Sequence, residues 1–271
     1  MKNIFIIVSL LFILVSCEDV VIVPLNTADA KLVIDANIKW NKTNTGAIQS
    51  IKLSLTSDFY SNTVPPANGA LVYVTNSANT QFIFNEVGTT GEYTCTNFVP
   101  LSNENYTLTV NYKGQIYTAT DTLLPTPPIL NVAQETLPSF TSTRIEVKFF
   151  FQDPASQNNY YLINFKSNTE LLPRYAPIRD EFFQGNLMFG RFSNDDIKAG
   201  DNLFMSVQSI SNRYYTYFQK LNEIAGTNGG APFSTPPATI RGNIINQTDV
   251  NNFPLGYFAI TELASRNYMV Q

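Results

Sequence analysis

The chain has 271 residues, a formal net charge of −4 and no histidine. The missing histidine excludes Ser–His and Cys–His nucleophile pairs and histidine-based metal sites, and the acidic balance argues against a nucleic-acid partner. Because only 14 % of the residues are charged while aromatic residues are frequent, the composition is typical of a β-rich secreted protein.

Residues 1–16 have the features of a secretory signal peptide. Lys2 is the only charge before the apolar run Ile4–Leu14, which is shorter than the about 20 residues that a membrane span needs. The tetrapeptide Leu14-Val15-Ser16-Cys17 matches the bacterial lipobox, in which the cysteine is acylated and the chain is cut just before it. We therefore expect Cys17 to carry lipid. The alternative is a plain signal peptide that ends near a cysteine.

Lipidation determines the location that we predict for the protein. Each buried lipid CH₂ contributes about 0.8 kcal/mol, so several acyl chains form a stable membrane anchor. Glu18 and Asp19 resemble the acidic pair that directs lipoproteins of Bacteroidota to the outer face of the outer membrane; the alternative is two acids in a solvated tether. We expect residues 17–29 to form the tether, and the body to be held at the outer membrane, facing the cell exterior.

From residue 30 onward, short segments follow one another at the spacing of strands. The segments Ile51–Leu55 and Tyr106–Tyr112 alternate apolar and polar residues, which places one face in a core and the other in water. The sequence Tyr112-Lys113-Gly114-Gln115 predicts a tight hairpin turn. Seven such segments predict an Ig-like β-sandwich over residues 30–124. These segments are Leu32–Ile38, Ile51–Leu55, Leu71–Thr75, Phe82–Phe84, Tyr93–Phe98, Tyr106–Tyr112 and Ile116–Leu123.

A proline-rich segment at residues 125–128 follows, and we predict a domain boundary there because proline makes a chain extended and semi-rigid. The alternative is an ordinary proline-rich loop. A second β-rich domain is expected over residues 129–271. Its strands are predicted near residues 144–151, 160–165 and 203–210, and the chain closes with the segments 240–244, 255–260 and 267–270.

This second domain is expected to carry one helix near residues 212–225. Apolar and aromatic residues recur there at three- and four-residue steps between Tyr214 and Ala225, Ser211 is a plausible N-cap, and Gly226 ends the pattern. We interpret the aromatic stripe as a core face. The segment 171–190 shows no period and is predicted to be irregular, and residues 193–200 are predicted to form a capped helical turn.

Five residues of the irregular segment are candidate ligand or partner contacts. Arg174, Tyr175, Arg179, Phe182 and Phe183 combine arginine with aromatic rings, as binding hot spots do. The alternative is burial of these rings against the sandwich.

Other residues suggest little chemistry. Asp121-Thr122-Leu123 resembles the O-glycosylation sequon of Bacteroidota, so Thr122 is a candidate modification site, although chance occurrence in a strand is the alternative. We expect Cys95 to be a buried, unpaired, apolar side chain. Asp195-Asp196 with Asp201 lacks the spacing of a calcium loop and fits cap and turn roles. We expect no catalytic residue, no metal and no cofactor.

Several short motifs together give the chain a family resemblance. They are the lipobox, Leu32-Val33-Ile34, Gly91-Glu92-Tyr93, the double proline, Phe192-Ser193-Asn194-Asp195, the Tyr-rich helix, Gly242-Asn243-Ile244 and Leu255-Gly256-Tyr257-Phe258. The chain is similar in these respects to an uncharacterised Bacteroidota family of outer-membrane lipoproteins, often encoded beside TonB-dependent receptors. The resemblance implies a non-enzymatic binding or accessory component of a TonB-dependent uptake system, with the receptor as a partner.

Two other functions stay open. One is a structural or adhesive spacer at the cell surface, built from Ig-like modules. The other is a hydrolase that uses carboxylates alone, although the 21 acidic residues single out no pair.

Overall fold

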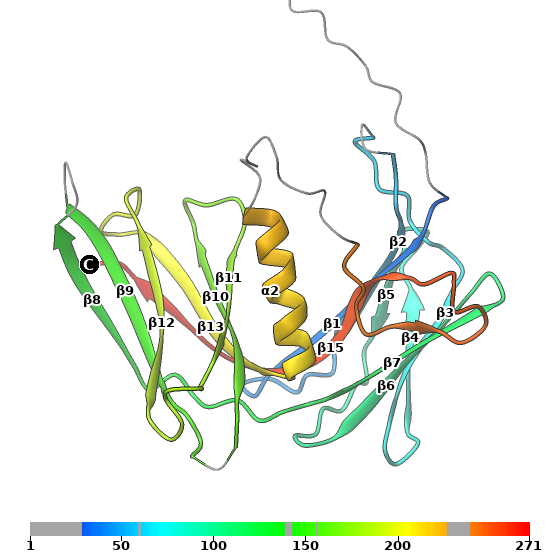
Figure 1. Cartoon of the computed structure of the whole chain (residues 1–271), viewed down its shortest axis with the longest axis horizontal. Helices are drawn as coiled ribbons and strands as arrows, with labels where there is room; N and C mark the ends of the chain where they lie inside the picture. The colour runs from blue at the N-terminus through cyan, green and yellow to red at the C-terminus, as the bar shows by residue number, and fades with distance from the viewer. Residues whose placement is uncertain (1–28, 59–60, 139–142, 156, 227–238) are drawn as a thin grey trace, which may run out of the picture.

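The computed structural model describes residues 29–58, 61–138, 143–155, 157–226 and 239–271. The predicted signal peptide, Cys17, Glu18 and Asp19 lie outside the described residues. Within these ranges the chain forms two sheets and one helix (Figure 1). The larger sheet has twelve strands in the order β11-β10-β13-β15-β1-β2-β5-β4-β3-β6-β7-β14, and the smaller has the order β12-β9-β8.

The first seven strands coincide with the seven predicted segments and surround one core. They are β1 (Leu32–Asn41), β2 (Gln49–Leu55), β3 (Leu71–Asn76), β4 (Gln81–Glu86), β5 (Glu92–Cys95), β6 (Asn105–Tyr112) and β7 (Gln115–Thr122). The alternation in β6 buries Tyr106, Leu108 and Val110 completely, because successive side chains of a strand point to opposite faces. The predicted hairpin turn joins β6 to β7, with Lys113 and Gly114 at positive φ.

The next six strands build a second core between the small sheet and one end of the large sheet. They are β8 (Asn131–Pro138), β9 (Thr143–Gln152), β10 (Tyr160–Ser167), β11 (Arg174–Arg179), β12 (Leu187–Asn194) and β13 (Asn202–Ile210). Phenylalanine dominates this core, where Phe149 lies 5.4 Å from Phe165 and 6.2 Å from Phe151 between ring centroids. The predicted class, a mainly β protein with a sandwich followed by a second β-rich part carrying one helix, is confirmed.

Two expectations for this part are wrong. The segment 171–190 is not irregular, because it contains β11 and the start of β12. Both are edge strands, and β11 accommodates Pro177, which a central strand would exclude because proline cannot donate a ladder hydrogen bond. The segment 193–200 is not a helical turn: β12 continues to Asn194, whose Oδ1 then accepts a 3.1 Å hydrogen bond from the Asp196 N–H in a turn.

One long strand connects the two cores. The two segments predicted near residues 255–260 and 267–270 are parts of β15 (Leu255–Met269), which pairs in parallel with β1 and, farther along, antiparallel with β13. The short strand β14 (Ile245–Asn246) pairs with β7. Ile244, Phe258 and Ile260 therefore belong to the first core. The domain boundary at residues 125–128 stays a prediction. Residues that follow this boundary in the sequence nevertheless belong to the first core, because β14 and the start of β15 pair with strands of the first part.

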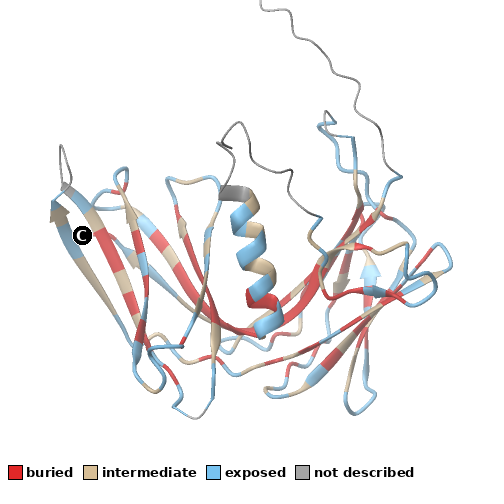
Figure 2. Ribbon diagram, viewed as in Figure 1, coloured by how far each residue is buried: buried red, intermediate tan, exposed pale blue. Residues whose placement is uncertain are grey.

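The helix α2 (Asn212–Gly226) lies where it was predicted and begins as predicted. The Ser211 Oγ accepts a 3.3 Å hydrogen bond from the Tyr214 N–H, which satisfies a free donor of the first turn. In Figure 1 the elements describe a U, and α2 stands inside it on the long sheet. Figure 2 shows buried residues in the strands beneath α2 and at the start of the helix, while its outer side is largely exposed.

The Gly-Asn-Ile and Gly-Tyr-Phe motifs meet at a close backbone crossing. A Cβ on Gly242 would lie 1.8 Å from the Gly256 carbonyl oxygen, and one on Gly256 would lie 2.0 Å from the Ile34 oxygen. The Asn243 side chain then bonds Phe258 twice, donating from Nδ2 to its oxygen at 2.7 Å and accepting from its N–H at 2.9 Å. These motifs hold segment 241–246 against β15.

Candidate functional site: a cationic groove beside α2

A groove of about 1010 Å³ runs between α2 and the segment 239–242. Its described lining comprises Asn212, Arg213, Thr216, Tyr217, Lys220, Glu223, Ile224, Thr239, Ile240, Arg241, Gly242 and Tyr257. The volume lies at the upper end of the range for small-molecule sites. The groove is larger than the two other hollows described below, and it is the candidate binding site.

The helical period decides which residues of α2 line the groove. Tyr214 is buried toward β15, where its ring centroid lies 4.5 Å from that of Tyr257. Tyr217, three residues later, lies at the boundary between sheet and groove, 4.7 Å from the same ring. Arg213 and Lys220 are on the exposed side. The aromatic side chains of α2 form a packing face, as predicted. Tyr217, at the edge of this face, also lines the groove.

The groove is positively charged although the chain is acidic. Arg213, Lys220 and Arg241 face a single lining carboxylate, that of Glu223. The Arg241 guanidinium stacks 3.7 Å from the centroid of the Phe253 ring, which orients it. The sequence shows no basic cluster because Arg213 and Lys220 lie seven residues apart on α2, and Arg241 joins them only through the docking of segment 239–242 on β15.

A buried carboxylate lies near the start of α2. Asp121 in β7 is 9 % exposed, and one of its oxygens accepts a 3.2 Å hydrogen bond from the Ile260 N–H. Burial raises the pKa of Asp121 from 3.8 to about 6, although hydrogen bonds from Ile260, Thr122 and Ser211 and the charge of Arg213 oppose that shift. Burial also raises the pKa of the Tyr257 hydroxyl. Through these hydrogen bonds the Asp121 carboxylate links β7 to β15 and to Ser211, the residue that caps α2.

A smaller hollow of about 430 Å³ lies on the face of β1, β2 and β5 that points away from the first core, and it is bounded by Tyr175 of β11. Asn37 and Lys39 lie there beside α2 and β11: the Asn37 Nδ2 donates a 3.0 Å hydrogen bond to the Tyr214 hydroxyl, and the Lys39 Nζ lies 5.8 Å from the Tyr175 ring. Burial lowers the pKa of Lys39, and the charge of Asp35 opposes that shift. Positive and negative side chains are balanced in this hollow, unlike in the groove.

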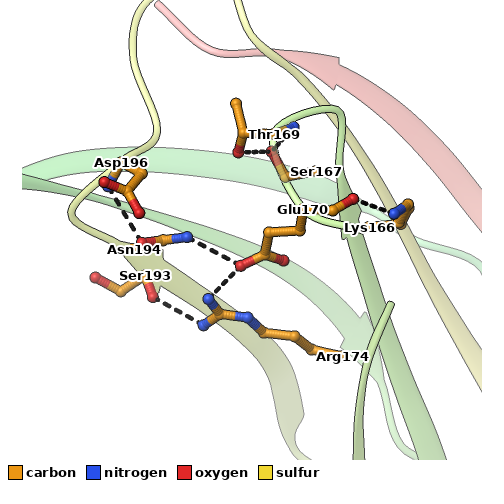
Figure 3. Close-up of polar contacts among 8 residues, drawn as sticks. All are labelled: Lys166, Ser167, Thr169, Glu170, Arg174, Ser193, Asn194 and Asp196. Atoms are coloured by element: carbon orange, nitrogen blue, oxygen red, sulfur yellow. Dashed lines mark hydrogen bonds and ion pairs between the residues drawn. The ribbon is translucent and has the colours of Figure 1, made fainter. Parts of the chain in front are cut away.

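The structure separates the five predicted contact residues. Arg174 and Tyr175 stand at the beginning of β11, and Arg179 ends it. Arg174 forms an ion pair with Glu170 and donates from Nη1 to the Ser193 oxygen at 3.4 Å (Figure 3). The Tyr175 ring packs 5.7 Å from Phe218 of α2.

The other three residues lie at the far end of β11. Arg179 forms an ion pair with Glu181. Phe182, 84 % exposed, and Phe183 occupy the turn that follows. The alternative of burial against the sandwich is therefore wrong for Phe182. The five residues do not form one site.

The remaining predicted residues have structural contacts. The Thr122 hydroxyl donates a 2.6 Å hydrogen bond to the Asn105 Oδ1, and its glycosylation stays a prediction. Cys95 is buried, as predicted, and its Sγ donates to the Asn97 Oδ1 at 3.1 Å. Burial raises the pKa of the Cys95 thiol. Asp201 accepts a 2.8 Å hydrogen bond from the Lys198 N–H, which is a turn contact.

Two features are absent from the described part of the chain. No group of three His, Cys, Asp or Glu side chains in this part of the chain is placed to hold a metal ion. The helix within the described ranges lacks the length and apolar character needed to cross a bilayer.

Fold and groove together define a mainly β protein of two sandwich-like parts joined by a shared strand. The chain belongs to the family described as "Domain of unknown function (DUF4249)", whose model matches residues 18–266. No curated protein matches the sequence.

Three solved structures show a distant similarity to this chain. A two-domain fibronectin type-III segment from chicken tenascin is 8 % identical, with 60 % of this chain and 85 % of that chain covered and a TM-score of 0.23. The chicken CNTN1 FN1–FN3 domains are 12 % identical, with 66 % and 60 % covered and a TM-score of 0.25. A cytokine receptor complex is 9 % identical, with 68 % and 87 % covered and a TM-score of 0.24.

Proposed function

We propose that this chain is a surface-exposed outer-membrane lipoprotein of Bacteroidota that acts as a non-enzymatic binding component of a TonB-dependent uptake system. The groove beside α2 carries the proposal. Three cationic side chains and two tyrosine rings line it on an acidic chain, so its field favours an anionic ligand over neutral ones.

The sequence supports the location. The lipobox at Cys17 provides the anchor, the acidic pair Glu18-Asp19 provides the export signal, and the motif resemblance provides the link to a TonB-dependent receptor. A lipid tether confines the groove close to the membrane. Confinement raises the effective concentration of bound ligand near a transporter without any chemical step.

The test uses the native chain and a strain from which its gene is deleted. The tagged wild-type protein, purified from detergent-solubilised outer membrane, should bring a TonB-dependent transporter with it. The deletion strain should grow poorly on at least one nutrient whose uptake depends on that transporter. Cys17→Ser should fail to restore growth, because the unlipidated protein is not retained at the membrane.

The groove itself is tested by charge reversal on the exposed side of α2. Lys220→Glu should restore growth less well than the wild type, because the substitution reverses a charge in the groove while keeping a good helix former. Lys198→Glu, in the turn before β13, is the matched control and should restore growth fully. Normal uptake in the deletion strain, together with capture of a surface protein other than a transporter, would favour the structural or adhesive role instead.

A further inference from the structure

A second cationic hollow lies in the other part of the molecule, at the open edge of the second sandwich. Here β11, an edge strand of the large sheet, faces β12, an edge strand of the small sheet. The cleft between them has a volume of about 340 Å³. Its lining includes three arginines and two phenylalanines: Arg144, Arg174, Arg191, Phe165 and Phe192.

The floor of this arginine cleft is apolar. Phe165 and Phe192 are both buried, and their ring centroids lie 5.5 Å apart. The Arg174 guanidinium lies 5.0 Å from the centre of the Phe192 ring. A ligand in the cleft therefore meets aromatic rings below and guanidinium groups around it.

The three arginines differ in how firmly they are held. Arg174 is fixed by Glu170 and the Ser193 carbonyl, and Glu170 is itself bonded by the Asn194 Nδ2 at 2.9 Å (Figure 3). Arg191 has a longer contact, 3.4 Å, with Glu146.

Arg144 forms no ion pair with any described residue. Glu146 is also engaged by Lys148 at 2.8 Å, so it does not neutralise Arg191 alone. The cleft has an excess of positive charge and free guanidinium donors.

We infer that the arginine cleft binds a small organic anion, a carboxylate or phosphate carried by an aromatic or branched apolar group. Guanidinium forks match the paired oxygens of these anions, and the phenylalanine floor accepts the apolar body. The volume fits a ligand at the lower end of the usual range of binding sites. Arg174 orients the site, while Arg144 and Arg191 supply the donors.

The test is calorimetric titration of the purified full chain with four probes at low salt. Benzoate and phenyl phosphate carry both an anion and a ring, benzyl alcohol lacks the anion, and inorganic phosphate lacks the ring. We expect benzoate or phenyl phosphate to bind at least about tenfold more tightly than benzyl alcohol and inorganic phosphate. The better of the two anions identifies the ligand as a carboxylate or a phosphate. Equal binding of benzyl alcohol would overturn the inference.

Single substitutions of the cleft arginines test whether the anion binds in the cleft. Arg144→Gln and Arg191→Gln should each weaken binding of the preferred anion by about fivefold or more, and Arg144→Lys should restore part of it. Arg266→Gln, an exposed arginine on β15 outside the cleft, is the control and should change binding less than about twofold. Unchanged binding in both cleft variants, with unaltered thermal unfolding, would contradict the assignment. This result is independent of transporter capture and of the groove beside α2.

Discussion

Thr126 and Glu262 hold the proline-rich segment against the long strand. The Thr126 N–H donates to the Glu262 Oε1 at 3.1 Å, and the Thr126 hydroxyl donates to the Glu262 carbonyl oxygen at 2.8 Å. The same hydroxyl accepts a 2.8 Å hydrogen bond from the Ser209 N–H of β13. The segment predicted to be a linker is therefore bonded to both strands at the point where the two parts of the molecule join.

Loss of the Glu262 carboxylate should destabilise this joint. Glu262 is 2 % exposed, accepts from the Ser102 hydroxyl at 2.9 Å and pairs with Lys42 at 2.8 Å. Glu262→Ala leaves the Thr126 and Ser102 donors without acceptors, so we expect the free energy of unfolding to fall by about 3 kcal/mol. Urea unfolding followed by circular dichroism measures it.

Two further variants calibrate that result. Glu262→Gln keeps one acceptor oxygen and should lose roughly half as much stability. Glu92→Ala removes an exposed carboxylate of β5 and should change stability by less than about 0.5 kcal/mol. Equal stability of Glu262→Ala and Glu92→Ala would show that the Glu262 contacts do not contribute to the free energy of unfolding.

Gly256→Ala should be strongly destabilising because two separate constraints act on this residue. Its φ of +94° disfavours any side chain, and a Cβ would meet the Ile34 oxygen at 2.0 Å. Gly114→Ala is the matched control, since Gly114 has a φ of +75° and nothing within 4 Å. We expect the free energy of unfolding to fall by about 1 kcal/mol in Gly114→Ala and by at least about 2 kcal/mol more in Gly256→Ala, as measured by thermal unfolding. Similar losses would mean that β1 and β15 can move apart.

Asp121 should make the stability of the protein depend on pH. Its pKa is raised from 3.8 to about 6 in the folded state, so the folded chain binds one more proton than the unfolded chain between these values. The stabilising contribution of the protonated group is full below pH 4 and is lost as pH rises to 6. The integrated loss is about 3 kcal/mol.

Comparison with Asp121→Asn isolates this effect from the other carboxylates. The amide can still accept from the Ile260 N–H and does not titrate, so the variant should gain stability relative to the wild type as pH rises from 4 to 7. The measurement is the difference in unfolding free energy between the two proteins at each pH. A difference that stays constant across this range would refute a raised pKa.

Cys95 should be unreactive until the protein unfolds. Its side chain is 1 % exposed, and burial raises the pKa of its thiol, which lowers the fraction of reactive thiolate. If Cys17 is acylated as proposed, the mature protein should show no rapid reaction with a thiol reagent in buffer and one equivalent of reaction in denaturant. Two equivalents in denaturant would mean that Cys17 is not acylated, and fast reaction in buffer would mean that β5 opens readily.

The sequence predicted well those features that depend on local periodicity. Alternation identified β2 and β6, and the aromatic stripe between Tyr214 and Phe218, with its serine cap, identified α2. It failed at β11 and β12 although burial alternates along both strands, because the residue types do not follow that alternation. The exposed face of β12 carries Leu187 and Phe189, and β11 contains Pro177, so neither segment shows the apolar–polar pattern of a half-buried strand.

The mainly β character and the helix could therefore be predicted from the order of the residues, since each is encoded within short stretches, while lipidation at Cys17 stays a prediction. The two cationic hollows could not be predicted in this way. Arg213 and Arg241 line one hollow because segment 239–242 docks on β15 beside α2, and Arg144 and Arg191 line the other because β9 pairs with β12. Such encounters depend on which distant strands pair and in which register, and that choice is made by the burial of whole faces rather than by any local pattern.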